Sequence, residues 1–306
     1  MNKKSFPSLI TGIILVFVPW TLYLGGCANP SPIVTEIQPT FTLQPTSTHT
    51  SIPISTKTPI PASSTPDIRT NLADADHMHL LYVPAGQFRM GSDSGSDNER
   101  PAHSVYLDEF WIDETEVTVH MYSLCVKAKV CKEPGNKSSA LYANYYGSPD
   151  FENYPVIHVN WNMAKTYCEW AGRHLPTEAE WEKAARGEHS LTYPWGNEGP
   201  NARLLNFEDQ KRDVTAVGSY PDGASPYGAL DMAGNAWEWV ADWYSHTYYA
   251  DSPDVNPWGP RSGQERVVKG GSWHDDSIVV RSSNRDHRAP DDACVNCGFR
   301  CAVSRQ

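Results

Sequence analysis

The chain has 306 residues, of which 40% are hydrophobic and 20% charged, and its formal net charge at pH 7 is -11. An acidic chain in which no basic patch stands out is a poor partner for nucleic acid or for anionic lipid head groups, so we expect neither. Cationic or neutral ligands, or a divalent metal, fit this charge better.

The first 26 residues have the pattern of a bacterial export signal. A lysine pair precedes an apolar run from Ile10 to Leu24, and Cys27 follows two small residues directly after that run. The thiol at this position receives diacylglycerol, and acyl chains hold a protein on a membrane surface. The pattern predicts a signal peptide at 1–26, lipidation of Cys27, and a mature protein in the bacterial cell envelope, facing outside the cytoplasm. A transmembrane anchor is the alternative, but Pro19 interrupts the run and its length is marginal for a span.

Residues 27–75 are predicted to be a linker. Residues 28–66 hold eight of the chain's 24 prolines, many Ser and Thr, and no glycine. Proline fixes the backbone and removes hydrogen-bond donors, while Ser and Thr give no apolar surface to bury. We therefore expect a solvated polyproline-II tether that reaches on the order of 120 Å when fully extended.

From residue 76 to residue 306 the composition is that of a folded domain. This part is mixed apolar and charged and holds most of the 11 tryptophans, without a second Pro/Ser/Thr tract or a repeat of fixed period. Its length allows one large domain or two small ones, and the uniform composition favours one. Near its start, Leu80–Gly86 and Gln87–Met90 are predicted to form two short β segments joined by a turn.

Two helices are predicted from their capping residues. Thr118 is a suitable N-cap for a helix that runs towards Lys129. Asn160 caps a second helix in the same way, and Gly172 offers a left-handed stop. The apolar spacing of this second helix places Cys168 on its inner face.

Six cysteines remain after Cys27, and an even number in an exported chain favours disulfides. Fifteen pairings are possible. Cys125 and Cys131 flank a short turn and are able to close on each other. Cys294 and Cys297 have the spacing of a redox or metal motif, but they lie in a loop rich in Asp and Asn and not at the start of a helix, which favours a structural disulfide.

A third helix begins at a capping box of Thr177 and Glu180 and ends at Gly187. At this helix the chain resembles the formylglycine-generating enzyme (sulfatase-modifying factor) family. The similarity extends over six ordered blocks: Val83–Ser92, Tyr167–Glu182, Tyr193–Asn197, Asp231–Trp239, Gly270–Trp273 and Gly298–Ala302. The resemblance implies a single α+β domain of the C-type-lectin-like kind with much irregular chain, and a disulfide between Cys168 and Cys301.

The resemblance also implies structural calcium, and the loop that starts at Asp231 offers carboxylates that suit a hard cation. The ligands of the first implied site are the side chains and carbonyls of Asp231, Gly234, Ala236 and Glu238. The ligands of the second are Asn206, the Phe207 carbonyl and, as the acid, Asp213. The alternative is that the acidic residues of this loop form a solvated turn.

The oxidases of this family bind Cu(I) through two thiolates and convert a substrate cysteine to formylglycine. In this chain the two cysteine positions fall near Asp275 and Val280, so no catalytic residue is predicted. Carboxylates are hard donors and do not replace a soft thiolate pair, so copper is not expected. Cys294 and Cys297 are the other thiols near enough in the sequence to be considered.

The resemblance places six residues along the family's groove, which would suit a peptide, a carboxylate or a sugar. They are Trp237, Ser272, Trp273, His274, Arg281 and Arg285. For the two tryptophans, core packing is the alternative. For the two arginines it is ion pairing with acids such as Asp286.

The function favoured by the sequence is that of a lipid-anchored, non-oxidase binding or scaffold module, with a peptide, a glycan or an envelope protein as its ligand. A formylglycine-generating oxidase with relocated cysteines and a structural protein of the envelope are alternatives. A third is a non-haem iron enzyme that uses His274 with Asp275 or Asp276. Neighbouring side chains in an extended segment point to opposite faces, which weakens the iron hypothesis.

Overall fold

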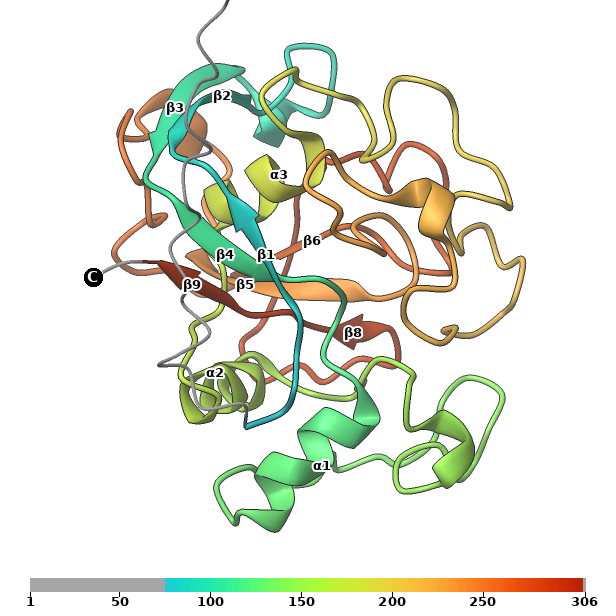
Figure 1. The fold of residues 1–306 in the computed structure, drawn as a ribbon. Helices are drawn as coiled ribbons and strands as arrows, with labels where there is room; N and C mark the ends of the chain where they lie inside the picture. Colours follow the sequence, from blue (N-terminus) through green and yellow to red (C-terminus); the bar gives the residue numbers. More distant parts are fainter. Residues whose placement is uncertain (1–74, 305–306) are drawn as a thin grey trace, which may run out of the picture. The chain divides into compact units, whose positions relative to one another are not determined.

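A computed structural model describes residues 75–304 of the chain (Figure 1). The predicted signal peptide, Cys27 and nearly all of the predicted linker lie outside the described residues. The described part combines short helices with small sheets and long irregular segments, in agreement with the α+β, C-type-lectin-like fold expected from the sequence. None of its helices is long and apolar enough to cross a membrane.

Nine short strands of the described part form three sheets. The first is antiparallel, in the order β1 (Leu80–Val83), β4 (Phe110–Asp113), β9 (Ala302–Ser304). The second pairs β2 (Gly86–Met90) with β3 (His103–Leu107). The third has the order β7 (Asp286–Arg288), β6 (Arg266–Lys269), β5 (Trp237–Trp243), β8 (Cys297–Gly298), and its β5–β8 pair is parallel. The strands predicted at Leu80–Gly86 and Gln87–Met90 correspond to β1 and β2.

The three predicted helices are confirmed with their caps. They are α1 (Val119–Lys127), α2 (Trp161–Trp170) and α3 (Glu178–Arg186). The side chains of Thr118 and Asn160 each accept a hydrogen bond from a backbone N–H in the first turn, and the capping box of Thr177 is formed. Short 3-10 turns complete the regular structure: η2 (Asp97–Glu99), η3 (Pro149–Phe151), η4 (Pro221–Gly223) and η5 (Tyr248–Ala250).

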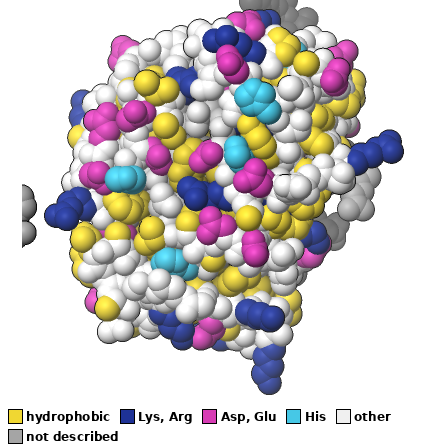
Figure 2. Space-filling view, turned by 180° about the vertical axis from the view of Figure 1, so that it is seen from behind, with side chains coloured by type: hydrophobic (Ala, Val, Ile, Leu, Met, Phe, Trp, Pro, Cys, Tyr) yellow, Lys and Arg dark blue, Asp and Glu magenta, His cyan; other side chains and the backbone are white. Residues whose placement is uncertain are grey.

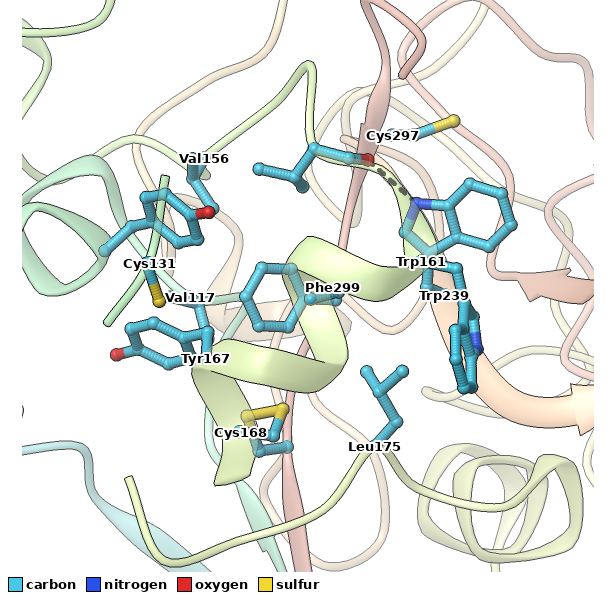
Figure 3. Close-up of a cluster of buried hydrophobic side chains, with 14 of the residues drawn as sticks. Val117, Cys131, Val156, Trp161, Tyr167, Cys168, Leu175, Trp239, Cys297 and Phe299 are labelled. Atoms are coloured by element: carbon cyan, nitrogen blue, oxygen red, sulfur yellow. Dashed lines mark hydrogen bonds between the residues drawn. A yellow bond between two sulfur atoms is a disulfide. The ribbon is translucent and has the colours of Figure 1, made fainter. Parts of the chain in front are cut away.

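All six cysteines of the described part form disulfides. Cys125 pairs with Cys131, Cys168 with Cys301, and Cys294 with Cys297, so the three predicted bridges are confirmed. Cys168 is fully buried, and its bridge fixes α2 to the residue that precedes β9. Figure 3 shows this disulfide in the main apolar cluster, with Phe299 in the middle of the cluster. The cluster joins α2 to the sheet of β5, β6 and β8, and the disulfide connects it to the start of β9.

Strand β5 runs through the middle of the described part, with α3 on one side and α1 and α2 on the other (Figure 1). Every residue of α3 is buried although five of its nine residues carry charge. A buried charge is costly unless it is paired. The partners of these charges therefore determine how the surrounding loops are held.

Candidate functional site

The loop that follows β6 begins with two glycines that allow it to fold back on the core. Gly270 and Gly271 have φ angles of 90° and 72°, a region that favours glycine. A Cβ atom on Gly271 would lie 2.8 Å from the side chain of Val280. This close approach brings the segment 272–280 against the core of the domain.

Asp275, near which the resemblance places the first family cysteine, is part of a hydrogen-bonded turn. Its Oδ2 accepts bonds from the backbone N–H of Ser272 at 2.9 Å and from the Ser272 hydroxyl at 2.6 Å. The hydroxyl of the fully buried Ser272 in turn accepts a bond from the Asn296 amide at 2.8 Å. This carboxylate oxygen therefore stabilises the turn between Ser272 and Asp275.

Val280, near which the resemblance places the second family cysteine, is fully buried. It packs in an apolar cluster with Tyr193, Leu205, Phe207 and Ala233. An aliphatic side chain offers no metal ligand. The two residues nearest to the expected cysteine positions are thus a hydrogen-bonded carboxylate and a buried valine.

The side chains of His274, Asp275 and Asp276, the residues of the iron hypothesis, bind different partners and do not converge on one point. The side chain of His274 is 65% exposed, and its Nδ1 lies 2.8 Å from the Asp209 carboxylate, whose hydrogen bond raises the pKa of His274. Asp276 instead accepts two backbone N–H groups of the turn that follows it. Among residues 75–304 no group of three or more His, Cys, Asp or Glu side chains is arranged to hold a metal.

The two arginines predicted to line a groove are bound to carboxylates. Arg281 makes a two-armed contact with Glu99, at 2.6 and 2.8 Å. Arg285 makes the same kind of contact with Glu178, also at 2.6 and 2.8 Å. Ion pairing was therefore the correct alternative, but Asp286 was the wrong partner for Arg285. A partner on α3 was not visible from the sequence because Glu178 lies more than 100 residues away.

The two tryptophans of the predicted groove are also buried. Trp237 belongs to the main apolar cluster, and Trp273 packs in a second cluster beside Val119 and Ile157. The Nε1 of Trp273 is buried without a hydrogen-bond partner in the described part of the chain. The alternative of core packing describes both side chains better than a groove wall does.

Three carboxylates surround the fully buried Arg300, close to the first implied calcium site. Glu238 accepts two bonds from Arg300 at 2.7 Å each and a third from the Trp181 indole at 2.7 Å. Burial, with Asp231 and Glu238 nearby, raises the pKa of Glu116 well above its usual value, and burial raises the pKa of Asp231 to about 6. One oxygen of Glu116 accepts a bond from the Asn235 amide at 2.9 Å. Three buried carboxyl groups thus lie near a single arginine, and Glu116 is the one whose pKa favours the protonated form.

The second implied calcium site lies next to this cluster because Gly234 allows two loops to touch. Gly234 has φ 73°, and a Cβ there would lie 2.3 Å from the Asn206 carbonyl oxygen. The Asn206 amide donates to the Asp213 carbonyl at 2.8 Å, while its own Oδ1 is buried without a partner in the described part. The Asp213 carboxylate is already bonded to the Ser139 hydroxyl and to the backbone N–H of residue 141.

Sequence reasoning missed Glu116 and Arg300. Arg300 lies in the block Gly298–Ala302, which carries part of the family resemblance, but an arginine in a sequence block does not reveal which acid it will bind. Glu116 is one of several acids in the stretch 113–116, which reads equally well as a solvated run. Its burial, not its type, distinguishes it.

One face of the described part shows Lys and Arg side chains interspersed with Asp and Glu, without a continuous basic area (Figure 2).

Comparisons with a family profile, with known sequences and with solved structures all point to the same family. A profile of the sulfatase-modifying factor enzyme 1-like domain matches residues 66–305. The formylglycine-generating enzyme of Streptomyces coelicolor is 37% identical over 283 residues, which cover 72% of this chain and 88% of that protein. The inactive C-alpha-formylglycine-generating enzyme 2 of Bos taurus is 31% identical over 289 residues, covering 76% and 90%. The solved structure of PvdO from Pseudomonas aeruginosa aligns with a TM-score of 0.63 at 27% identity, covering 74% of this chain and 94% of PvdO.

Proposed function

This chain belongs to the family of sulfatase-modifying factor enzyme 1-like domains, and from that premise we propose that it is a non-oxidase member with a binding or scaffold role. One observation carries the proposal. The Asp275 carboxylate is bonded to the Ser272 hydroxyl and Val280 is buried in an apolar cluster, so neither residue near the expected cysteine positions offers a thiolate. Soft Cu(I) prefers thiolates, and a hydrogen-bonded carboxylate beside a valine does not fit it.

The alternative with relocated cysteines has little support. Cys294 and Cys297 are the thiols closest in sequence to the Asp275 loop, and their sulfurs are bonded to each other. A disulfide sulfur has no thiolate to give to a metal. One relative of this chain, moreover, carries the word inactive in its name.

For the cellular setting, we propose a lipid anchor at Cys27 and a location in the bacterial cell envelope. The support is the sequence alone, in which an apolar run, small residues and a cysteine follow a lysine pair. The linker of residues 27–75 would then hold the domain away from the membrane, where it would meet a peptide, a glycan or another envelope protein.

Calcium is the cofactor we propose, with Asn206 as its best-supported ligand. The buried, unpartnered Oδ1 of Asn206 fits a cation that takes oxygen ligands. Glu238 fits less well, because Arg300 and Trp181 already bind both of its oxygens. Calcium here would stabilise the two loops and would take no part in a reaction.

The oxidase reaction is the test. The full chain in detergent micelles is supplied with Cu(I), oxygen and a sulfatase peptide that contains the target cysteine, and the peptide is analysed by mass spectrometry for the aldehyde product. We expect unmodified peptide, with the Streptomyces coelicolor enzyme as the positive control. Aldehyde formation would overturn the proposal. If it then disappeared in a Cys294→Ser Cys297→Ser variant, these two cysteines would be the metal ligands.

A further inference from the structure

A small hollow lies on another part of the surface, between the loop 253–260, β3 and β9. None of its lining residues belongs to the 272–280 loop. Figure 1 shows the loop, in orange, beside β3, and Asn256 is bonded to the Tyr106 carbonyl at 2.9 Å. The hollow has a volume of about 210 Å³. This is below the several hundred Å³ that drug-sized ligands require, so it fits one ring of a larger ligand.

Trp258 lines the hollow and is a large aromatic side chain that stays exposed. It is 59% exposed, and Val255 in the same loop is 57% exposed. The Trp258 ring is supported by the imidazole of His174, with ring centroids 6.0 Å apart. Most tryptophans of the domain are buried, and an exposed indole beside a hollow presents a large flat face at a low entropic cost for a ligand to stack on.

Asp108 and Asn256 form a fixed polar pair in the same hollow. The Asn256 amide donates to the Asp108 carboxylate at 2.8 Å, and the Asp108 backbone N–H donates to the Asn256 Oδ1 at 2.9 Å. A side-chain amide has two N–H donors and a carboxylate has two oxygens. The pair, which lines the hollow, therefore retains one further donor and one further acceptor on two side chains that hold each other.

An adjacent donor and acceptor match two neighbouring hydroxyl groups, because each hydroxyl both donates and accepts. A cationic ligand matches the hollow less well. The Glu180 carboxylate is already bonded to the Thr177 N–H, the Ser304 hydroxyl and His174. Asp108 is the other acid of the lining, and a single exposed carboxylate binds a cation weakly.

We propose that this hollow is a subsite for one pyranose ring of an oligosaccharide, with the glucose configuration. The C–H face of such a ring would stack on Trp258, and two neighbouring equatorial hydroxyls would bond to Asp108 and Asn256. The assignment rests on the binding role proposed above and gives that role a ligand class.

Isothermal titration of the full chain with cellotetraose tests the subsite. The chain is kept in a polyoxyethylene detergent, since detergents with sugar head groups would compete. We expect saturable binding with a Kd of about 1 mM. Trp258→Ala should weaken it at least about tenfold, as loss of a stacking face removes more than 1.4 kcal/mol. Asp108→Ala should weaken it about fivefold, since the indole remains and one fixed polar partner is lost. Ile278→Ala is the matched control, because Ile278 is 63% exposed but lies outside the hollow.

Several results would overturn the assignment. These are no saturation up to about 10 mM cellotetraose, an unchanged affinity in a Trp258→Ala variant with the wild-type melting temperature, or saturable binding of N-acetyl-lysine amide in place of the sugar. Trp258→Phe keeps an aromatic face and should retain part of the affinity, which separates stacking from a general loss of structure. Aldehyde formation in the oxidase assay would refute the non-oxidase role without removing the sugar subsite, so the two proposals fail separately.

Discussion

Removal of the Cys168–Cys301 disulfide should cost far more stability than removal of the Cys125–Cys131 disulfide. Both bridges are almost completely buried, and both have ordinary Cα–Cα separations of 5.6 and 5.3 Å. They differ mainly in the length of chain that they close, with sequence separations of 133 and 6 residues. The pair therefore isolates the effect of loop length.

The expected difference follows from the entropy of the unfolded chain. A cross-link that closes the long loop stabilises the folded state by about 5 kcal/mol, and one that closes the short loop stabilises it by about 2 kcal/mol. The two double variants, Cys168→Ala Cys301→Ala and Cys125→Ala Cys131→Ala, should thus differ by about 3 kcal/mol in the free energy of unfolding. Both lose similar buried sulfur atoms, so the cavity left behind largely cancels.

Guanidinium unfolding followed by tryptophan fluorescence measures this difference, and equal slopes of the two transitions show that the unfolded states are comparable. The reasoning is refuted if the two variants unfold within about 1 kcal/mol of each other. A larger cost for the short bridge would show that it supports the α1 loop in a way that loop entropy does not describe. Reduction of the wild-type protein gives the lower limit for both.

Two further predictions concern buried charge. Chelation of calcium should lower the melting temperature of the full chain by about 5–10 °C, and Asn206→Ala should abolish that shift. Glu238→Gln should instead lose stability equally with and without calcium, because it breaks the Arg300 contact. An undiminished shift in Asn206→Ala would remove Asn206 from the calcium site. Burial, with Glu178 nearby, raises the pKa of Asp242 to about 8. The folded state therefore retains a proton that the unfolded state has released, and stability falls as the pH rises from about 4 to 8. Asp242→Asn should be more stable than the wild type by about 1–3 kcal/mol at pH 8, with a gain that grows across this window; a gain independent of pH would contradict the assignment.

Local elements of the fold were predictable because their causes are local. A capping side chain and the backbone N–H that it binds lie three residues apart, so Thr118, Asn160 and Thr177 identified the three helices before any tertiary contact was known. The pairing of Cys168 with Cys301 is different. It joins residues 133 positions apart, and it was available from the family resemblance and not from the chain's own periodicity.

The candidate groove was predicted poorly because residue type does not determine burial. An arginine or a tryptophan has the same sequence signature in a binding site and in a core. Arg281 and Arg285 find their acids on η2 and α3, far away in the sequence, and Trp237 packs beside a disulfide. Trp258 was not singled out, because its exposure depends on the loop that carries it.

The sequence blocks that carry the family resemblance contain residues that contact one another in the buried core. Trp181, Glu238 and Arg300 come from three of the six matching blocks, and they bind one another in the interior. Glu178 and Arg285 join a fourth segment to the same helix. Such contacts are costly to break, since each would leave a charge buried without its partner. They preserve the fold whether or not a reaction takes place, and none of them involves Asp275 or Val280. The buried network of this chain therefore accounts for its family resemblance, and under the proposed non-oxidase role Asp275 and Val280 lie where the resemblance leads us to expect the thiolate pair of the oxidases.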